Sequence, residues 1–236
     1  GRLVRGPAHP PEERASAELI GAGWVQFPIV SLASRERAAL SDELLRVGPD
    51  RPTLCEGWTT RDLLAHLLVR ERQPHTAAGI LVPALATVTE RAMDGYREMP
   101  WDEAVALFRG GPQSWSPMRF ERVDAVANGM EFFVHHEDVR RGEPGWEPRE
   151  PDEERDAELW AGVRRMGVLL RRSPVGVVLA RPSGERHAVK TGPGVVTVLG
   201  EPGELVLFAF GRDAARVQLQ GEPGDVEALR AAPRGV

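Results

Sequence analysis

Apolar residues recur at helical intervals through the larger, N-terminal part of the chain. Leucine and alanine positions three or four residues apart predict a first helix over residues 31–47. A second helix is predicted from Thr59, where Asp62 completes a pattern close to a capping box. Further helical periods cover residues 83–96, 101–108, 119–141 and 152–172. The longest of these is predicted to end at residues 140–142, where two arginines are followed by a glycine.

Short apolar runs separated by turns replace the helical pattern toward the C-terminus. They predict strands at residues 175–180, 187–190, 195–199 and 216–220. Residues 204–210 fit either a strand or a helix, and residues 225–232 predict a short helix. Residues 1–30 sustain neither period and predict a poorly ordered extension. The chain is therefore expected to be α+β, with a helical domain over residues 31–172 and a small α+β domain over residues 173–236.

The composition is that of an ordinary folded protein, with 42% hydrophobic and 28% charged residues among 236 and a formal net charge of −5. A mildly acidic chain lacks the basic footprint of a nucleic-acid binder. No run reaches the roughly 18 apolar residues of a membrane span. The single cysteine, Cys55, excludes an internal disulfide framework, suits a cytoplasmic protein, and is interpreted as a small buried residue without a catalytic role. Lys190 is the only lysine among 30 basic residues, a bias typical of GC-rich genomes.

Glu131 and His135 stand four residues apart in a segment that otherwise predicts a core helix. Four helical residues turn the chain by about 400°, so both side chains leave one face about 6 Å apart along the axis and can share a cation. His136 would point away from Glu131 by about 140°. His66, on the second predicted helix, is a third candidate ligand. Two imidazoles and a carboxylate suit Zn²⁺ with an open fourth position, and the same set can hold Fe²⁺.

Each of these residues also has a purely structural interpretation. A buried Glu131 can be neutralised by one of the many arginines, while His135 and His66 can be hydrogen-bonded core histidines. Asp138, three residues after His135, can orient its imidazole. Asp62 can do the same for His66 or simply cap its own helix.

Two segments carry a resemblance to a known family. CEGWTTRDLLAHL at residues 55–67 and EFFVHHEDVRR at residues 131–141 resemble the N-terminal domain of mycothiol-dependent maleylpyruvate isomerases, one of the DinB-like metal-binding bundles. The resemblance implies an up-and-down four-helix bundle that holds zinc or another divalent metal. By position, the implied ligands are His66, Glu131 and His135. The C-terminal part is similar to the small α+β domain of these proteins, and the arginine of its Gly-Arg step, here Arg212, can face the metal pocket.

The resemblance also implies a thiol reaction. Mycothiol is the low-molecular-weight thiol of high-GC actinobacteria, which agrees with the arginine-rich composition. A zinc ion with an open position would bind that thiol as a thiolate. The thiol would add to a small electrophile, ending in S-conjugation or in cis–trans isomerisation, while Arg212 grips a substrate carboxylate.

Two alternative functions stay open at this point. One is a non-enzymatic bundle whose metal is structural and which serves as a binding or regulatory module. The other is an iron-dependent oxygenase. For the leading hypothesis the expected partners are a thiol and a small electrophile, with no nucleic acid and no membrane, and the chain is expected to be a monomer or homodimer.

Overall fold

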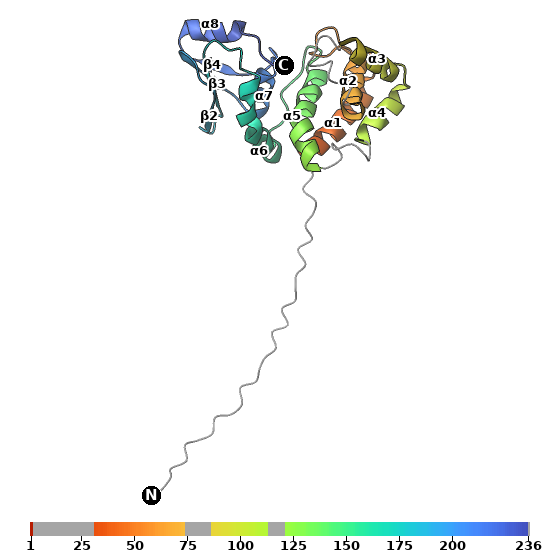
Figure 1. The fold of residues 1–236 in the computed structure, drawn as a ribbon, viewed down its shortest axis with the longest axis horizontal. Coiled ribbons are helices and arrows are strands. Elements are labelled where there is room, and N and C mark those ends of the chain that lie inside the picture. The colour runs from red at the N-terminus through yellow and green to blue at the C-terminus, as the bar shows by residue number, and fades with distance from the viewer. Residues whose placement is uncertain (2–30, 74–85, 113–120, 236) are drawn as a thin grey trace.

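The computed structural model of the chain describes Gly1 and residues 31–73, 86–112 and 121–235. Five helices gather on one side of the molecule, and a sheet with its own helices lies on the other (Figure 1). The predicted α+β class, with an N-terminal helical bundle and a small C-terminal α+β part, is confirmed. The predicted extension lies, apart from Gly1, outside the described residues. None of the helices in the described ranges combines the length and the apolar composition that a membrane span requires.

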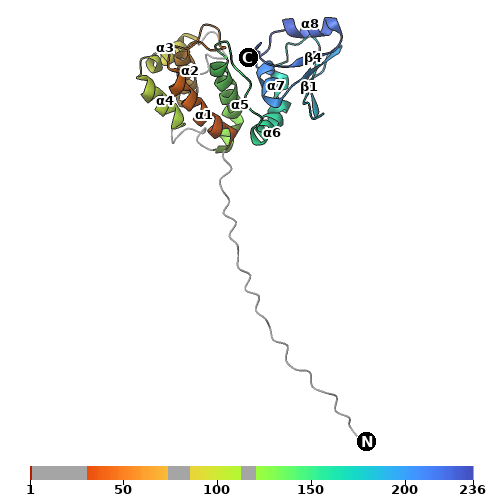
Figure 2. The ribbon, with the colours of Figure 1, turned by 180° about the vertical axis from the view of Figure 1, so that it is seen from behind.

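The N-terminal bundle is built from α1 (Leu32–Val47), α2 (Thr60–Arg72), α3 (Ala86–Arg97), α4 (Trp101–Arg109) and α5 (Glu121–Arg140). α1 lies along α5 and also contacts α4, while α2 contacts α3 and α4 (Figure 2). Its core contains Leu40, Leu67, Phe108 and Phe132, all fully buried. Because Leu67 of α2 and Phe132 of α5 belong to one core, the residues next to them on these two helices are held close together.

Local sequence signals account for the starts of the first two helices. The Thr59 side chain accepts a hydrogen bond from the backbone N–H of Asp62, and the Asp62 carboxylate accepts one from the backbone N–H of Thr59. The predicted capping box is thus confirmed. Ser31 caps α1 in the simpler way, by accepting from the backbone N–H of Ser34. Residues 83–85 of the predicted third helix lie outside the described residues.

Gly142 follows α5 as predicted, and the structure gives it a steric role. Its backbone does not adopt a positive φ. A Cβ on Gly142 would lie 2.1 Å from the carbonyl oxygen of Pro52. Nearby, the backbone N–H of Leu54 donates to the carbonyl of Asp138 over 3.0 Å. The missing side chain therefore lets the loop of residues 52–58 lie directly against the end of α5.

Gly142→Ala is expected to destabilise the protein by about 1–3 kcal/mol, the usual cost of forcing extra volume into a close-packed contact. The obstacle is backbone, so the loop of residues 52–58 has to move away. Urea unfolding measures the change. Gly95→Ala is the control, because Gly95 lies in α3 with open space where its Cβ would be. Alanine there should stabilise by about 0.5–1 kcal/mol. A Gly142→Ala protein as stable as the parent would show that the loop tolerates a side chain.

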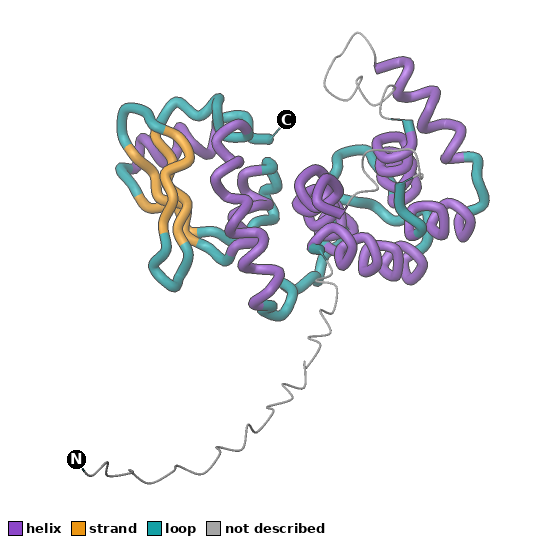
Figure 3. The backbone as a smooth tube through the Cα atoms, turned by 60° about the horizontal axis from the view of Figure 1, so that its bottom comes forward, coloured by secondary structure: helices purple, strands orange, loops and turns teal. Residues whose placement is uncertain are grey.

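The C-terminal part is a four-stranded sheet in the order β2-β1-β3-β4 with flanking helices (Figure 3). Its elements are β1 (Gly176–Ala180), β2 (Arg186–Lys190), β3 (Val195–Leu199), α7 (Pro202–Ala209), β4 (Gln218–Gln220) and α8 (Pro223–Ala231). β1 pairs in parallel with β3, whereas the β1–β2 and β3–β4 pairs are antiparallel. All four predicted strands are present. The ambiguous segment 204–210 is largely helix, as α7, which has Pro202 at its start.

The predicted helix over residues 152–172 is an α-helix only in its first half. α6 (Glu153–Gly162) continues as the 3-10 helix η4 (Val163–Val168). Two glycines here make close approaches: a Cβ on Gly162 would lie 2.7 Å from Met130 Sδ, and one on Gly167 would lie 2.5 Å from the carbonyl oxygen of Val189. α6 packs on α7, and η4 packs on β2. The domain boundary at residue 172 stays a prediction, and this packing favours a boundary before α6.

The two parts meet along α5. Leu32 of α1 and Phe133 and Val134 of α5 belong to the same buried cluster as the C-terminal residues. Beside this apolar contact, Arg141 pairs with Glu137 on one side and with Glu204 of α7 on the other, both over 2.6 Å. α5 therefore offers one face to the bundle and another to the C-terminal part.

Candidate metal centre

His66, Glu131 and His135 converge between α2 and α5. Glu131 Oε1 lies 3.6 Å from His66 Nε2 and 3.7 Å from His135 Nε2. One ligand atom from each residue lies within 4.8 Å of the other two. The two imidazole rings meet edge to face with centroids 5.3 Å apart. The four-residue spacing on α5 thus places its two side chains together, and the bundle brings the distant His66 to the same point.

Apolar neighbours shield this cluster from water. His66 and His135 are 6% and 8% exposed, and the Glu131 side chain is 23% exposed. On α2, Leu63 and Leu67 flank His66 and are fully buried. The Trp58 ring, which the sequence did not single out, lies with its centroid 5.1 Å from that of His66. In such surroundings charges interact more strongly than in water.

Arg70 is a functional candidate that the sequence interpretation missed. Its Nη1 lies 2.5 Å from Glu131 Oε2, on the carboxylate oxygen that does not face the two histidines. The ion pair offered as an alternative for Glu131 therefore exists, and it leaves Oε1 to the histidines. A signal for it was present in the sequence, because Arg70 lies four residues after His66 and so on the same face of α2.

Two further residues support His135 from behind. Asp138 contacts the His135 imidazole, and Arg212 in turn contacts Asp138. Asp138, fully buried, lies with Oδ2 3.0 Å from His135 Nδ1. Arg212 grips the same carboxylate with two donors, Nε to Oδ1 over 2.9 Å and Nη2 to Oδ2 over 2.6 Å. Asp138 is thus placed to hold the His135 imidazole, with Nε2 turned toward Glu131. Arg212 comes to the site from the loop after α7, and its predicted contact with a substrate carboxylate stays a prediction.

Comparisons with known proteins bear on this arrangement. The family model described as the mycothiol maleylpyruvate isomerase N-terminal domain matches residues 30–79, which include His66. The resemblance predicted from the sequence is confirmed. A crystal structure of the mycothiol-dependent maleylpyruvate isomerase matches with a TM-score of 0.53 and 18% identity, covering 80% of this chain and 90% of that chain. A crystal structure of a mutant of that isomerase matches with a TM-score of 0.55 and 16% identity over the same shares.

At these identities the likeness to the isomerase structures establishes a shared fold. Comparison with curated protein sequences gives no match. The family match covers α1, α2 and the loop between them, so it includes the helix that carries His66 and leaves out α5. The assignment of Glu131 and His135 therefore depends on their spacing and on the geometry described above.

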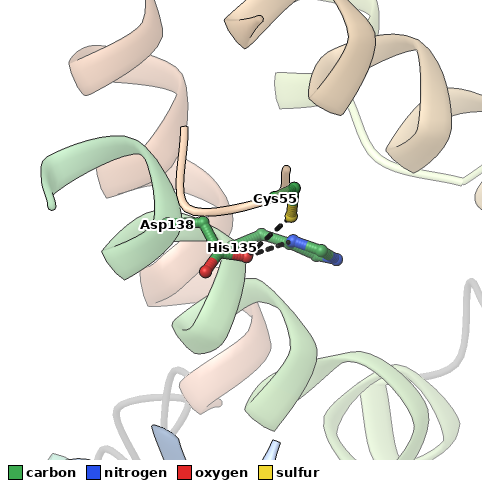
Figure 4. A group of neighbouring side chains, drawn as sticks. All are labelled: Cys55, His135 and Asp138. Carbon is green, nitrogen blue, oxygen red and sulfur yellow. Dashed lines mark hydrogen bonds and ion pairs between the residues drawn. The ribbon is translucent and has the colours of Figure 1, made fainter. Parts of the chain in front are cut away.

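Cys55 contacts two charged residues that are distant from it in the sequence, Asp138 and Arg212. It is half-buried, and its Sγ donates to Asp138 Oδ2 over 3.3 Å (Figure 4). The same Sγ lies 3.6 Å from Arg212 Nη2. The Thr53 hydroxyl fixes the loop by accepting from the Cys55 backbone N–H. Cys55, His135 and Asp138 also have ligand atoms within 4.8 Å of one another. A cation there would compete with Arg212 for both oxygens of Asp138, so the cluster around Glu131 is the better cation site.

The pKa shifts of Glu131 and His66, the two residues that face His135, favour the protonation states that a cation site requires. Burial would raise the pKa of Glu131, but hydrogen bonds from His135 and His66 and the charge of Arg70 lower that pKa far below its usual value. Burial lowers the pKa of His66, which favours a neutral imidazole with a free lone pair. Burial opposes a charged His135, yet hydrogen bonds to Asp138, Cys55 and Glu131 raise its pKa well above normal. A cation bound there would displace a proton from His135.

His136 lies apart from this cluster, as the helical geometry predicted. Its Nδ1 lies 3.0 Å from Glu36 Oε2 on α1, and Arg149 pairs with the same carboxylate over 3.0 Å. The histidine that follows His135 therefore belongs to the packing of α1 against α5.

Proposed function

We propose that this protein is a metal-dependent thiol transferase or isomerase, with mycothiol as the thiol and a small electrophile as the second substrate. Zinc, or another divalent metal, would be held by His66, Glu131 and His135. The observation that carries the proposal is the convergence of Glu131 Oε1 with one nitrogen of each imidazole. The likeness to mycothiol-dependent maleylpyruvate isomerase supports the choice of thiol and of reaction class.

The three residues fit a zinc ion. Zinc lies about 2.0–2.2 Å from nitrogen and oxygen ligands, so two ligands of a tetrahedral site are about 3.4 Å apart. The separations of 3.6 and 3.7 Å from Glu131 Oε1 to the two Nε2 atoms are close to this value. Arg70 occupies only Oε2 of Glu131, so one oxygen is available for monodentate ligation. Three protein ligands leave a fourth position for a thiol.

Bound zinc with an open position supplies Lewis acidity, which lowers the pKa of a coordinated thiol and favours the thiolate at neutral pH. The chain's own residues prepare the site for it. Asp138 holds His135 at Nδ1, Arg70 holds the outer oxygen of Glu131, and the ring of Trp58 covers His66. In the proposed reaction the thiol sulfur forms a bond to an electrophilic carbon of the substrate. If that bond breaks again after rotation about the former double bond, the outcome is isomerisation.

Arg212 is proposed as the anchor for a substrate carboxylate. Two of its nitrogens already donate to Asp138, and Nη1 donates to the carbonyl of Phe210 over 2.8 Å. Together with the contact from Nη2 to Cys55 Sγ, these use four of the five N–H donors of the guanidinium. Arg212 is half-buried, so a substrate carboxylate would be held by the remaining N–H or in exchange for one of these acceptors.

The test combines metal analysis with an activity assay. We expect the purified protein to hold about one equivalent of metal, and to consume mycothiol in the presence of an electrophile such as maleylpyruvate. A chelator should stop the reaction and added zinc should restore it. The Arg70–Glu131 ion pair also fits the purely structural interpretation of Glu131, in which an arginine neutralises the carboxylate and no metal is bound. Protein that purifies without metal and gains no thermal stability from added zinc would support that alternative and sink the proposal. Iron in place of zinc would point to the oxygenase.

Asp138→Asn is expected to weaken zinc binding by about 10- to 100-fold, the usual effect of losing a partner behind a ligand histidine. The amide keeps the shape of the side chain but loses the charge that Arg212 and His135 share. Zinc affinity, measured by competition with a chromogenic chelator, gives the result. Cys55→Ala is the matched control, since it removes a neighbour of the same carboxylate without changing its charge. Equal affinities for Asp138→Asn and Cys55→Ala would contradict a positioning role for Asp138.

A further inference from the structure

A small cavity lies in the C-terminal part, beside the loop that carries Arg212. Its volume is about 140 Å³. Apolar side chains from α7, from β4 and from the segment before β4 form part of its wall: Phe208, Ala215, Val217 and Leu219. The volume is well below the roughly 300–1,000 Å³ of pockets that take drug-sized ligands, so only a molecule of a few heavy atoms would fit.

The charged side chains of the same cavity are mostly cationic. Arg212, Arg230 and Arg234 line it, and Asp213 is the single acidic residue among them. Arg212 is balanced by Asp138. Arg234 pairs with Asp213, whose side chain is 93% exposed, so water screens that pair. Arg230, exposed in the last turn of α8, has no ion-pair partner within the described part of the chain. The cavity therefore carries uncompensated positive charge.

One buried donor in the wall of this cavity lacks an acceptor. The Arg234 side chain is 9% exposed, with its guanidinium 4.5 Å from the centroid of the Phe208 ring. Its Nε is buried and finds no hydrogen-bond partner among the described residues. A buried N–H without an acceptor is costly and rare in folded proteins. The other two nitrogens have acceptors, Nη1 in the carbonyl of Arg230 over 3.4 Å and Nη2 in Asp213 over 2.6 Å, so the Arg234 guanidinium is incompletely hydrogen-bonded at the cavity wall.

We propose that this cavity binds a small organic anion, a carboxylate with a short apolar part. The guanidinium group of Arg230 offers the forked donors that suit a carboxylate, and Arg234 adds positive charge beside it. The apolar wall suits a chain of a few carbon atoms. Such a ligand would also approach Arg212, which holds Asp138 behind His135. The proposal does not depend on the metal site, because all of its contacts lie in the C-terminal part. A free phosphate shares the anionic chemistry and is a second source for the same site.

The test is a titration of the full-length protein, stripped of metal by a chelator so that a carboxylate cannot bind a metal ion. Butyrate is the probe, butyramide its neutral counterpart, and inorganic phosphate the anion without an apolar part. Calorimetry or NMR follows the binding. The variant is Arg230→Gln, which is exposed and should leave the fold intact. Arg171→Gln, an exposed arginine outside the cavity, is the matched control.

We expect saturable binding of butyrate that weakens about tenfold in Arg230→Gln, stays unchanged in Arg171→Gln, and falls as salt is added. If phosphate binds and its affinity falls equally in Arg230→Gln, the cavity is still an anion site, and its ligand is phosphate. No saturable binding of either anion would overturn the proposal. So would equal affinities for the two variants, or butyramide binding as tightly as butyrate.

Discussion

His135→Ala is expected to abolish zinc binding at the proposed site, whereas His136→Ala leaves it intact. The two histidines are adjacent on α5, but only His135 turns its Nε2 toward Glu131, while His136 pairs with Glu36 on α1. Losing a direct ligand should cost more than the roughly 100-fold that loss of a positioning partner costs. Zinc at about 100 times its Kd should stabilise the parent protein by about 2.7 kcal/mol, and this gain should vanish in His135→Ala.

Thermal unfolding with and without zinc, together with elemental analysis, measures both variants. His136→Ala lowers the stability of the metal-free protein because it leaves Glu36 with one partner fewer, yet it should keep the zinc-induced gain. Glu131→Gln is a third variant that keeps the side-chain shape and should behave like His135→Ala. Full zinc binding by His135→Ala would place any metal elsewhere in the chain and remove the basis of the proposed function.

Arg141→Met is expected to lower the free energy of unfolding by about 3–5 kcal/mol. Arg141 is 4% exposed and pairs with two carboxylates, Glu137 and Glu204, at the junction of α5 and α7. Methionine fills a similar volume but leaves Glu204 buried without its main partner, and an unpaired buried charge costs several kcal/mol. Urea denaturation measures the loss.

The controls distinguish the cost of leaving a buried charge unpaired from the cost of removing any arginine. Arg46→Met removes an arginine that is 69% exposed and pairs with Glu43, so its effect should stay within about 0.5 kcal/mol. Adding Glu204→Gln to Arg141→Met should recover part of the stability, because the uncompensated charge is then gone. A loss for Arg141→Met no larger than for Arg46→Met would contradict this account.

The same network predicts how stability depends on pH. Burial alone would raise the pKa of Glu137, but Arg149, Arg140 and Arg141 lower it below its ordinary value of 4.5. Stability from a lowered carboxyl pKa is present above the unfolded value and is lost as the pH falls through the folded one. The parent protein should therefore lose stability on acidification below pH 4.5, and Arg141→Met should lose less over that range.

Features that depend on neighbours in the chain could be predicted from the sequence. The capping box of Thr59 and Asp62 and the shared face of Glu131 and His135 follow from helical geometry, in which residues three or four apart meet whatever the rest of the fold does. The pattern of apolar residues separated the helical part from the strands for the same reason. Arg70 was within reach of this reasoning, since it stands four residues after His66.

Features that depend on distant packing could not be predicted in this way. The sequence around Cys55 indicates an isolated thiol, because its partner Asp138 lies 83 residues away. The contact between Arg212 and Asp138 likewise joins residues 74 positions apart. The segment that forms α7 is apolar on nearly every side, so its periodicity did not distinguish a helix from a strand. The break from α6 into η4 depends on close contacts of Gly162 and Gly167 with Met130 and Val189.

The sequence by itself determined which side chains share a helix face, because the period of the helix is set by local hydrogen bonds and is the same in every fold. Only the tertiary structure decided which faces meet. That choice depends on burying apolar residues far apart in the chain, such as Leu67 with Phe132, and it brings His66 to Glu131 and carries Arg212 to Asp138.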